Sequence, residues 1–218
     1  MRKLIKNNYP KTFLYIKCIK NFFIFILYYI RIKLFLLKNK NNKINLIIGS
    51  GGTSYKNWIK SNIETINLLE KKSFDLFFKL DSIDTILCEH VFEHLTYEQG
   101  KIAAKNIYLY LKKGGFARIA VPDGNHPSQD YIKWVRPGGV GDGASDHKIL
   151  YNYKNFTKIF INQCFKVKIL EYFDENGIFH HQQWNSEDGF IHRSRDSDKR
   201  NINGKINYSS IIVDVIKI

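Results

Sequence analysis

The chain has 218 residues, of which 44% are hydrophobic, so it is long enough for one domain with a substantial core and a modest appendage. Its three cysteines are odd in number, widely spaced and form no C-x-x-C pair. That spacing argues against a disulfide framework and against a cysteine-rich zinc module. We therefore expect a protein of the reducing cytoplasm.

The net charge of +14 is concentrated at the N-terminus. Residues 1–43 hold eleven Lys or Arg residues and no acid, and subtracting these leaves only +3 for the remaining 175 residues. A nearly balanced body argues against nucleic acid as a partner, because nucleic-acid binding needs a clustered basic surface. We treat residues 1–43 as a basic, apolar tail and residues 44–218 as the folded domain.

The tail contains an apolar run from Phe22 to Ile30, nine residues long and bracketed by basic residues. A membrane-spanning helix needs about 20 mostly apolar residues, and no small-residue cleavage site follows the run. We expect residues 12–38 to form a helix that contacts the inner, anionic face of a membrane peripherally. The alternative is a helix that packs on the domain, with the stems of Lys and Arg covering apolar surface.

Beyond residue 43, short apolar runs alternate with amphipathic segments. In chain order, we expect strands at 44–48, 83–87, 116–122, 165–173 and 208–218, and helices at 97–111 and 152–164. Strands that alternate with helices indicate an α/β protein with a mostly parallel sheet covered by helices on both faces.

Three polar clusters follow predicted strands: the glycine loop at 49–52, the stretch EHVFEH at 89–94 and the stretch PDGNHP at 122–127. Ligands of such sheets bind beyond the carboxyl ends of the strands. The sequence therefore predicts that these clusters lie together at one edge of the sheet.

His90, Glu93 and His94 also have the order H-x-x-E-H of the ligands in inverted zinc proteases. In those enzymes the motif lies within a long helix, whereas here His90 follows a short buried strand. We therefore expect no metal site at these residues. A second interpretation is structural, in which Glu89 and His94 satisfy free backbone donors at the start of the next helix.

Several stretches together resemble the class I S-adenosylmethionine-dependent methyltransferases, and more narrowly a bacterial subgroup of predicted methyltransferases. They are INLIIGSGGT, IDTILCEHVFEHLT, YLKKGGFARIAVPDG, GFIHRSRDSDKRN and YSSIIVDVIK. The resemblance covers about residues 44–218. It implies a Rossmann-like fold, S-adenosylmethionine as the cofactor and methyl transfer as the reaction.

The resemblance also implies a set of cofactor-binding positions, which are Gly49, Ser50, Gly51, Asn62, Glu64, Glu89 and His90. Glycines let the backbone approach the cofactor closely, although an ordinary turn also explains them. The family has an acid after the second strand that accepts from both ribose hydroxyls, but Asn62 stands at that position. Glu64, on the same side of a strand as Asn62, is a candidate replacement. Solvated loop polarity is the competing interpretation for both residues.

The spacing of the first half is short. Ten residues separate Gly51 from Asn62, fewer than the dozen or more that a crossover helix takes. We expect the first half of the sheet to be abbreviated, with one flank of the cofactor left open or covered by the N-terminal helix.

Methyl transfer from a sulfonium is an in-line displacement, in which the enzyme positions the reactants and supplies a base where the acceptor loses a proton. The candidate catalytic residues are His90, at the end of the middle strand, and Asp146 with His147. For Asp146 and His147, a helix cap and a surface histidine are the alternative interpretation.

A long polar insertion precedes the last strand. Its notable members are Tyr172, Asp174, Glu175, His180, His181, Trp184, His192, Arg193, Arg195 and Arg200. This mixture suits a small or glycan-related acceptor with a hydroxyl or amine, and its histidines lack metal-ligand spacing. A second hypothesis is a catalytically inactive, methyltransferase-like accessory protein at the membrane, which Asn62 and the short first half keep open.

Overall fold

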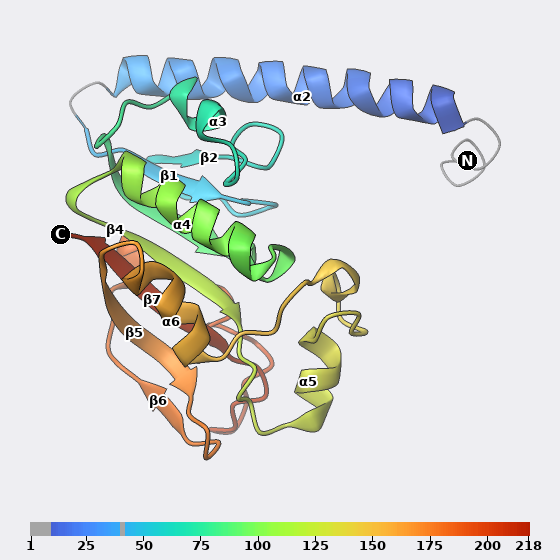
Figure 1. Ribbon diagram of the computed structural model, residues 1–218, viewed down its shortest axis with the longest axis vertical. Helices are drawn as coiled ribbons and strands as arrows, with labels where there is room; N and C mark the ends of the chain where they lie inside the picture. Colours follow the sequence, from blue (N-terminus) through green and yellow to red (C-terminus); the bar gives the residue numbers. More distant parts are fainter. Residues whose placement is uncertain (1–9, 40–41) are drawn as a thin grey trace.

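A computed structural model describes residues 10–39 and 42–218. Figure 1 shows a twisted sheet with helices packed against it and the long helix α2 (Pro10–Lys38) lying across one end of the molecule. The other helices are α3 (Lys71–Asp75), α4 (Tyr97–Tyr110), α5 (Gln129–Val135) and α6 (Tyr153–Ile161), with short 3-10 helices η1 (Phe92–His94), η2 (Ala144–Asp146) and η3 (Ser186–Asp188).

The sheet contains seven strands in the order β2-β1-β3-β4-β7-β5-β6. They are β1 (Asn45–Ile48), β2 (Trp58–Lys60), β3 (Ile83–Glu89), β4 (Leu111–Pro122), β5 (Phe165–Phe173), β6 (Phe179–His181) and β7 (Ser210–Lys217). The first four strands pair in parallel, β7 runs antiparallel to β4 and β5, and β6 runs antiparallel to β5. Five strands therefore share one direction, which confirms the predicted α/β, Rossmann-like sheet.

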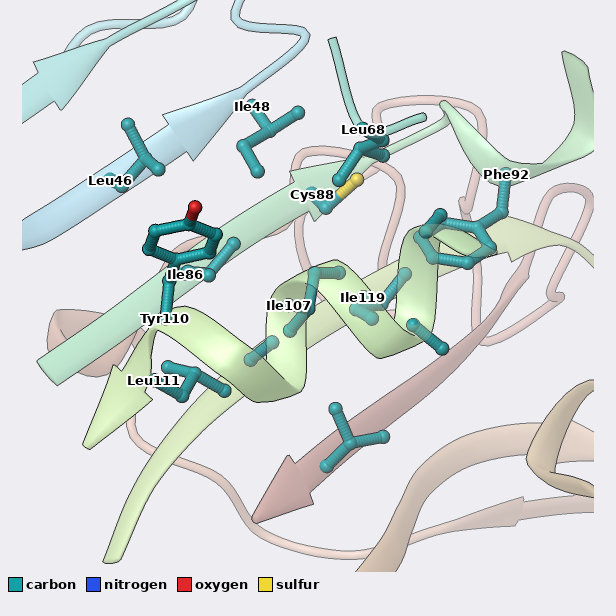
Figure 2. Packing of buried hydrophobic residues seen from close by; sticks show 14 of the residues in the cluster. Leu46, Ile48, Leu68, Ile86, Cys88, Phe92, Ile107, Tyr110, Leu111 and Ile119 are labelled. Atoms are coloured by element: carbon teal, nitrogen blue, oxygen red, sulfur yellow. The ribbon is translucent and has the colours of Figure 1, made fainter. Parts of the chain in front are cut away.

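The main hydrophobic core lies between one face of the sheet and the helices α4 and α6. Figure 2 shows side chains of β1, β3 and α4 packed in this core, among them Leu46, Ile86 and Ile107, which are fully buried. Alternate residues of the same strands point to the opposite face. There, Ile47 and Leu87 are covered by irregular segments, including Trp184, and not by helices. In this respect the structure differs from the expectation of helices on both faces.

Helix α4 begins immediately after the stretch EHVFEHL. The Thr96 side chain accepts from the backbone N of Gln99, and the Gln99 side chain accepts from the backbone N of Thr96. This reciprocal capping box fixes the start of the helix. Residues 90–95 consequently form a connection that contains only η1. The H-x-x-E-H residues therefore do not lie within a long helix, as an inverted zinc protease requires.

The first half of the sheet is abbreviated, as predicted, because residues 49–57 connect β1 to β2 without a helix. The C-terminal half of α2 packs beside this region. Ile32 is 2% exposed, and the ring centroids of Tyr29 and Phe77 lie 5.4 Å apart. No helix in the described part of the chain is long and apolar enough to cross a membrane.

Asp123 follows β4 and is fully buried. Its Oδ1 accepts from the backbone N of Asn125 (3.0 Å), and its Oδ2 accepts from the backbone N of Phe173 (2.7 Å), which ties β5 to the end of β4. Burial raises the pKa of Asp123 to about 6, because two hydrogen bonds to the carboxylate offset its desolvation only in part.

This raised pKa predicts a pH-dependent cost of burying Asp123. The folded state favours the protonated acid. The stabilisation that protonated Asp123 gives to the folded state is therefore fully present below the pKa of the unfolded chain, near 4, and is lost as the pH rises through about 6. We expect the free energy of unfolding of Asp123→Asn, relative to wild type, to rise between pH 4 and 7 by an amount on the order of 3 kcal/mol. Chemical denaturation across this pH range measures the difference, and a difference independent of pH would contradict the assignment.

Candidate active site

A cavity of about 700 Å³ lies beyond the carboxyl ends of β1 and β3. It is lined by the glycine loop after β1, the stretch after β3, the connection that follows α5, and the segment before β7. This size is ordinary for a small-molecule site, and the strand ends are the expected location in an α/β sheet. Two of the three predicted polar clusters meet here, whereas residues 122–127 do not line the cavity.

The glycine loop depends on the absence of a side chain at its first position. Gly49 has a φ of 65°, and a Cβ there would lie 2.5 Å from Cγ2 of Val91. The loop is held from the other side by Asn62, whose Oδ1 accepts from Ser50 Oγ (3.1 Å) and from Gly51 N (3.0 Å). Asn62 therefore uses its acceptor to fix the loop and does not present it to the cavity.

Glu89, the last residue of β3, holds a distant segment against the sheet. Its carboxylate accepts from the backbone N of His192 (3.2 Å) and of Arg193 (2.8 Å). Burial, and secondly the charge of Glu89, raises the pKa of the nearby Tyr55 to about 12. Tyr55 consequently stays a neutral hydroxyl, which donates to the carbonyl O of Phe190 (3.2 Å).

His90 follows β3 in the left-handed region, with a φ of 55°. This conformation is uncommon for a residue other than glycine and often marks functional positions. Its Nε2 lies 3.1 Å from Ser210 Oγ, which donates its own proton to the carbonyl O of Arg193, so Nε2 is the donor. Its Nδ1 lies 3.0 Å from Glu93 Oε1. Each ring nitrogen of His90 therefore lies against a protein atom, although the contact of Nδ1 with Glu93 lacks hydrogen-bond geometry.

Glu93, His94 and His147 form a compact cluster in the cavity wall, with one candidate ligand atom from each residue within 4.8 Å of the others. Glu93 is 1% exposed, and neither carboxylate oxygen accepts a hydrogen bond from the described residues. Nδ1 of His147 donates to the carbonyl O of Val135 (2.7 Å). In the neutral ring the lone pair is therefore on Nε2, which lies 4.0 Å from Glu93 Oε1.

The structure brings most of the predicted site residues to the cavity wall, namely Gly49, Ser50, Gly51, Glu89, His90 and His147. Asn62, Glu64 and Asp146 do not line it. We predicted that Glu64 lies on the same side of a strand as Asn62. The strand β2 ends at Lys60, before both residues, and Glu64 lies in a turn, so this prediction was wrong. Asp146 is mostly exposed, and its Oδ1 lies 2.9 Å from Nδ1 of His94.

The meeting of Glu93 and His94 with His147 was not predicted from the sequence. The H-x-x-E-H pattern marks the first two residues, but their contact with His147 is tertiary and has no local signal. The polar insertion is divided between two places. Its members His192, Arg193 and Arg200 line the cavity, whereas Tyr172, Asp174, Glu175, His180, His181, Trp184 and Arg195 do not.

No protein-family model matches the sequence, and no curated protein matches it. Among solved structures, the chain is similar to an S-adenosylmethionine-dependent methyltransferase from Archaeoglobus fulgidus, at 16% identity and a TM-score of 0.49, over 88% of this chain and 94% of that one. It is also similar to such an enzyme from Thermotoga maritima, at 12% identity and a TM-score of 0.47, over the full length of both chains.

A third similar structure is phosphoethanolamine N-methyltransferase 2 of Haemonchus contortus, at 14% identity and a TM-score of 0.45, over 86% of this chain. This chain spans only 52% of that protein. At these identities and TM-scores, the fold assignment rests on the sheet topology itself, and the chemistry rests on the site.

The role of Asn62 in holding the glycine loop predicts a difference between two substitutions. Asn62→Ala removes the acceptor of the Gly51 amide, whereas Asn62→Asp keeps it. We expect the Gly51 amide to exchange with solvent roughly fivefold to tenfold faster in Asn62→Ala and to stay protected in Asn62→Asp, since one hydrogen bond is worth about 1 kcal/mol. NMR hydrogen exchange measures this, with the Gly124 amide, which donates to Tyr151 O away from the loop, as the internal control. Unchanged exchange of Gly51 in Asn62→Ala would refute the role.

Proposed function

We propose that this chain is an S-adenosylmethionine-dependent methyltransferase that acts on a hydroxyl or amine of a small or glycan-related acceptor. The observation that supports this most directly is that one cavity joins the glycine loop to the cluster of Glu93, His94 and His147. The glycine loop suits a cofactor that the backbone approaches closely, and the cluster suits an acceptor that must lose a proton.

The glycine-loop end fits the cofactor in part. A Cβ at Gly51 would meet no atom within 4 Å, so this residue borders open space, and Gly49 turns the chain away from β1. The family's ribose-binding carboxylate has no counterpart here, because Asn62 lies outside the wall and its Oδ1 is already bonded. S-adenosylmethionine bound here would supply an electrophilic methyl group on a sulfonium. We expect its affinity to depend on the loop backbone.

The residues at the other end position the acceptor and promote the loss of its proton. Because Nε2 of His90 donates to Ser210 and Nδ1 lies against the Glu93 carboxylate, we assign His90 to the wall and the loss of the proton to the neighbourhood of Glu93, His94 and His147. Trp134 also lines the cavity and is 47% exposed, so its ring offers a face to the apolar side of a sugar.

Cofactor binding is the first test of this function. We expect S-adenosylhomocysteine to bind the full chain with a dissociation constant in the micromolar range in a calorimetric titration. Asn62→Ala should weaken binding by about tenfold, because it frees the loop at a cost of roughly one hydrogen bond. Glu64→Gln is the matched control and should bind as wild type does, because Glu64 lies outside the cavity wall.

Weaker binding by Glu64→Gln would instead indicate that the Glu64 carboxylate accepts hydrogen bonds from the ribose hydroxyls of the cofactor. Absence of binding by the wild type, with binding restored in Asn62→Asp, would indicate a scaffold that has lost its cofactor. That result would favour the accessory protein over the enzyme.

We further propose that α2 contacts an anionic membrane face peripherally. The helix exposes large apolar side chains along its length, namely Leu14, Tyr15, Ile16, Ile19, Phe22, Phe23, Leu27, Ile30, Leu34 and Leu37. The helix carries basic residues and no acid. Exposed apolar surface combined with positive charge is the composition of helices that lie in a lipid interface.

Vesicle binding tests the membrane contact. We expect the full chain to co-sediment with vesicles that contain anionic lipid, and the bound fraction to fall with added salt. Replacing Phe22 and Phe23 together by Ser should weaken binding at least tenfold, since two buried aromatic side chains contribute more than about 1.4 kcal/mol. Ile202→Ser removes a comparably exposed side chain far along the chain and serves as the control. Equal binding of the two variants would exclude α2 as the contact.

A further inference from the structure

We infer that Glu93, His94 and His147 form a site for one divalent first-row transition metal ion, with Zn²⁺ as the representative. The three residues come from two places in the chain, η1 and the connection after η2, and they converge on the cavity wall. One candidate ligand atom from each lies within 4.8 Å of the others. This set excludes His90, so it differs from the H-x-x-E-H arrangement of an inverted zinc protease.

The strongest sign of a ligand is the state of Glu93. Burying a carboxylate without hydrogen-bond partners costs free energy of folding. In native proteins an ion or an ordered water often satisfies such a group. Glu93 is 1% exposed, and its two oxygens accept no hydrogen bond from the described residues. Nδ1 of His90 approaches Oε1 to 3.0 Å but lacks hydrogen-bond geometry, and Oε2 has no partner. A cation between the carboxylate and the two imidazoles would satisfy it.

One of the two histidines is already oriented as a metal ligand is. A ligating imidazole usually donates its second N–H to a carbonyl or a carboxylate, which fixes the ring and its tautomer. His147 does so through Nδ1 to the carbonyl O of Val135, and this leaves Nε2 directed toward Glu93. Nδ1 of His94 lies 2.9 Å from Oδ1 of Asp146 but lacks hydrogen-bond geometry, so the His94 ring is not yet fixed in this way. Asp146 is close enough to support the site through His94 once the side chains close on the ion.

The ligand set selects the class of ion. Two imidazoles and one carboxylate are typical of catalytic zinc sites and of other first-row transition metals, whereas Mg²⁺ prefers oxygen ligands. Around a tetrahedral ion with bonds of about 2.1 Å, ligand atoms lie roughly 3.4 Å apart. The cluster, at 4.8 Å or less, must therefore close by about 1 Å or a little more, a movement of side chains. Three protein ligands leave a fourth position open to the cavity.

The consequence for catalysis rests on the proposed function, although the metal site itself does not. A metal ion lowers the pKa of a hydroxyl bound to it. The acceptor oxygen at the open position would release its proton to water, and its electron pair would form the new bond to the methyl carbon. The bond from sulfur to that carbon breaks at the same time, and its electron pair remains on sulfur.

Direct metal binding to the untagged full chain tests the site, with Cys18→Ser and Cys164→Ser introduced to remove the exposed thiols. In competition with a chelator, we expect one equivalent of Zn²⁺ to bind, and binding to weaken at least a hundredfold in Glu93→Gln and in His147→Gln. His180→Gln alters a histidine that pairs with Asp174 away from the cavity and should bind as the parent does.

Thermal unfolding gives a second readout that a purely structural role would not produce. With free Zn²⁺ at 100 times its dissociation constant, the parent should melt roughly 5 to 10 °C higher, whereas Glu93→Gln should not shift. In chelator, Glu93→Gln should melt no lower than the parent, because it removes an unpaired buried charge.

Failure of the parent to bind one equivalent of Zn²⁺, or binding that survives in both folded variants, would overturn the site. Titration of S-adenosylhomocysteine in chelator, run on the same protein, separates this result from the cofactor proposal. Cofactor binding without Zn²⁺ binding would leave the methyltransferase standing and remove only the metal.

Discussion

The parallel register between β1 and β3 determines where everything else in the site lies. Ile48 pairs with Cys88, so the two strands end at the same edge of the sheet. The chain then turns at Gly49, whose backbone approaches Val91 so closely that a methyl group would lie 2.5 Å from the Val91 side chain. Glycine is required for that approach, and a single steric constraint therefore sets the distance between the loop and the stretch that follows β3.

Buried charges on the strands hold the irregular segment that closes the cavity. Arg118, 2% exposed, binds Asp214 through two hydrogen bonds of 2.8 and 2.9 Å and donates to two backbone carbonyls between β6 and β7. Glu171, 1% exposed, accepts from the backbone N of Arg195, and burial raises its pKa. Removing one partner of a buried ion pair such as Arg118 and Asp214 typically lowers the free energy of unfolding by roughly 3–5 kcal/mol. The segment between β6 and β7 has little regular structure and is positioned by these charged side chains of the sheet. Glu89 binds the same segment at the cavity, through the backbone amides of His192 and Arg193.

The sheet was predictable because strand and helix patterns depend on neighbours in the chain. The strand expected at 165–173 coincides with β5, and the helix expected from residue 97 begins where the Thr96 cap sets it. The site was less predictable because its contacts are tertiary. Nothing near His147 marks its approach to Glu93, and the Asn62 amide, interpreted as a ribose acceptor, bonds to the loop instead. The helix α5 has only seven residues, too few for a periodic pattern.

The same amide connects the glycine loop to the N-terminal helix. While Oδ1 of Asn62 holds Ser50 and Gly51, its Nδ2 donates to the hydroxyl of Tyr28 on α2 (3.3 Å). The helix thereby takes the place of the crossover helix that the short connection between β1 and β2 cannot contain, and Ile32 is buried against the core as a result. The side chains of α2 that pack on the domain and those that are exposed belong to one continuous helix. Tyr28 and Asn62 therefore form a continuous chain of hydrogen bonds from this helix to the glycine loop.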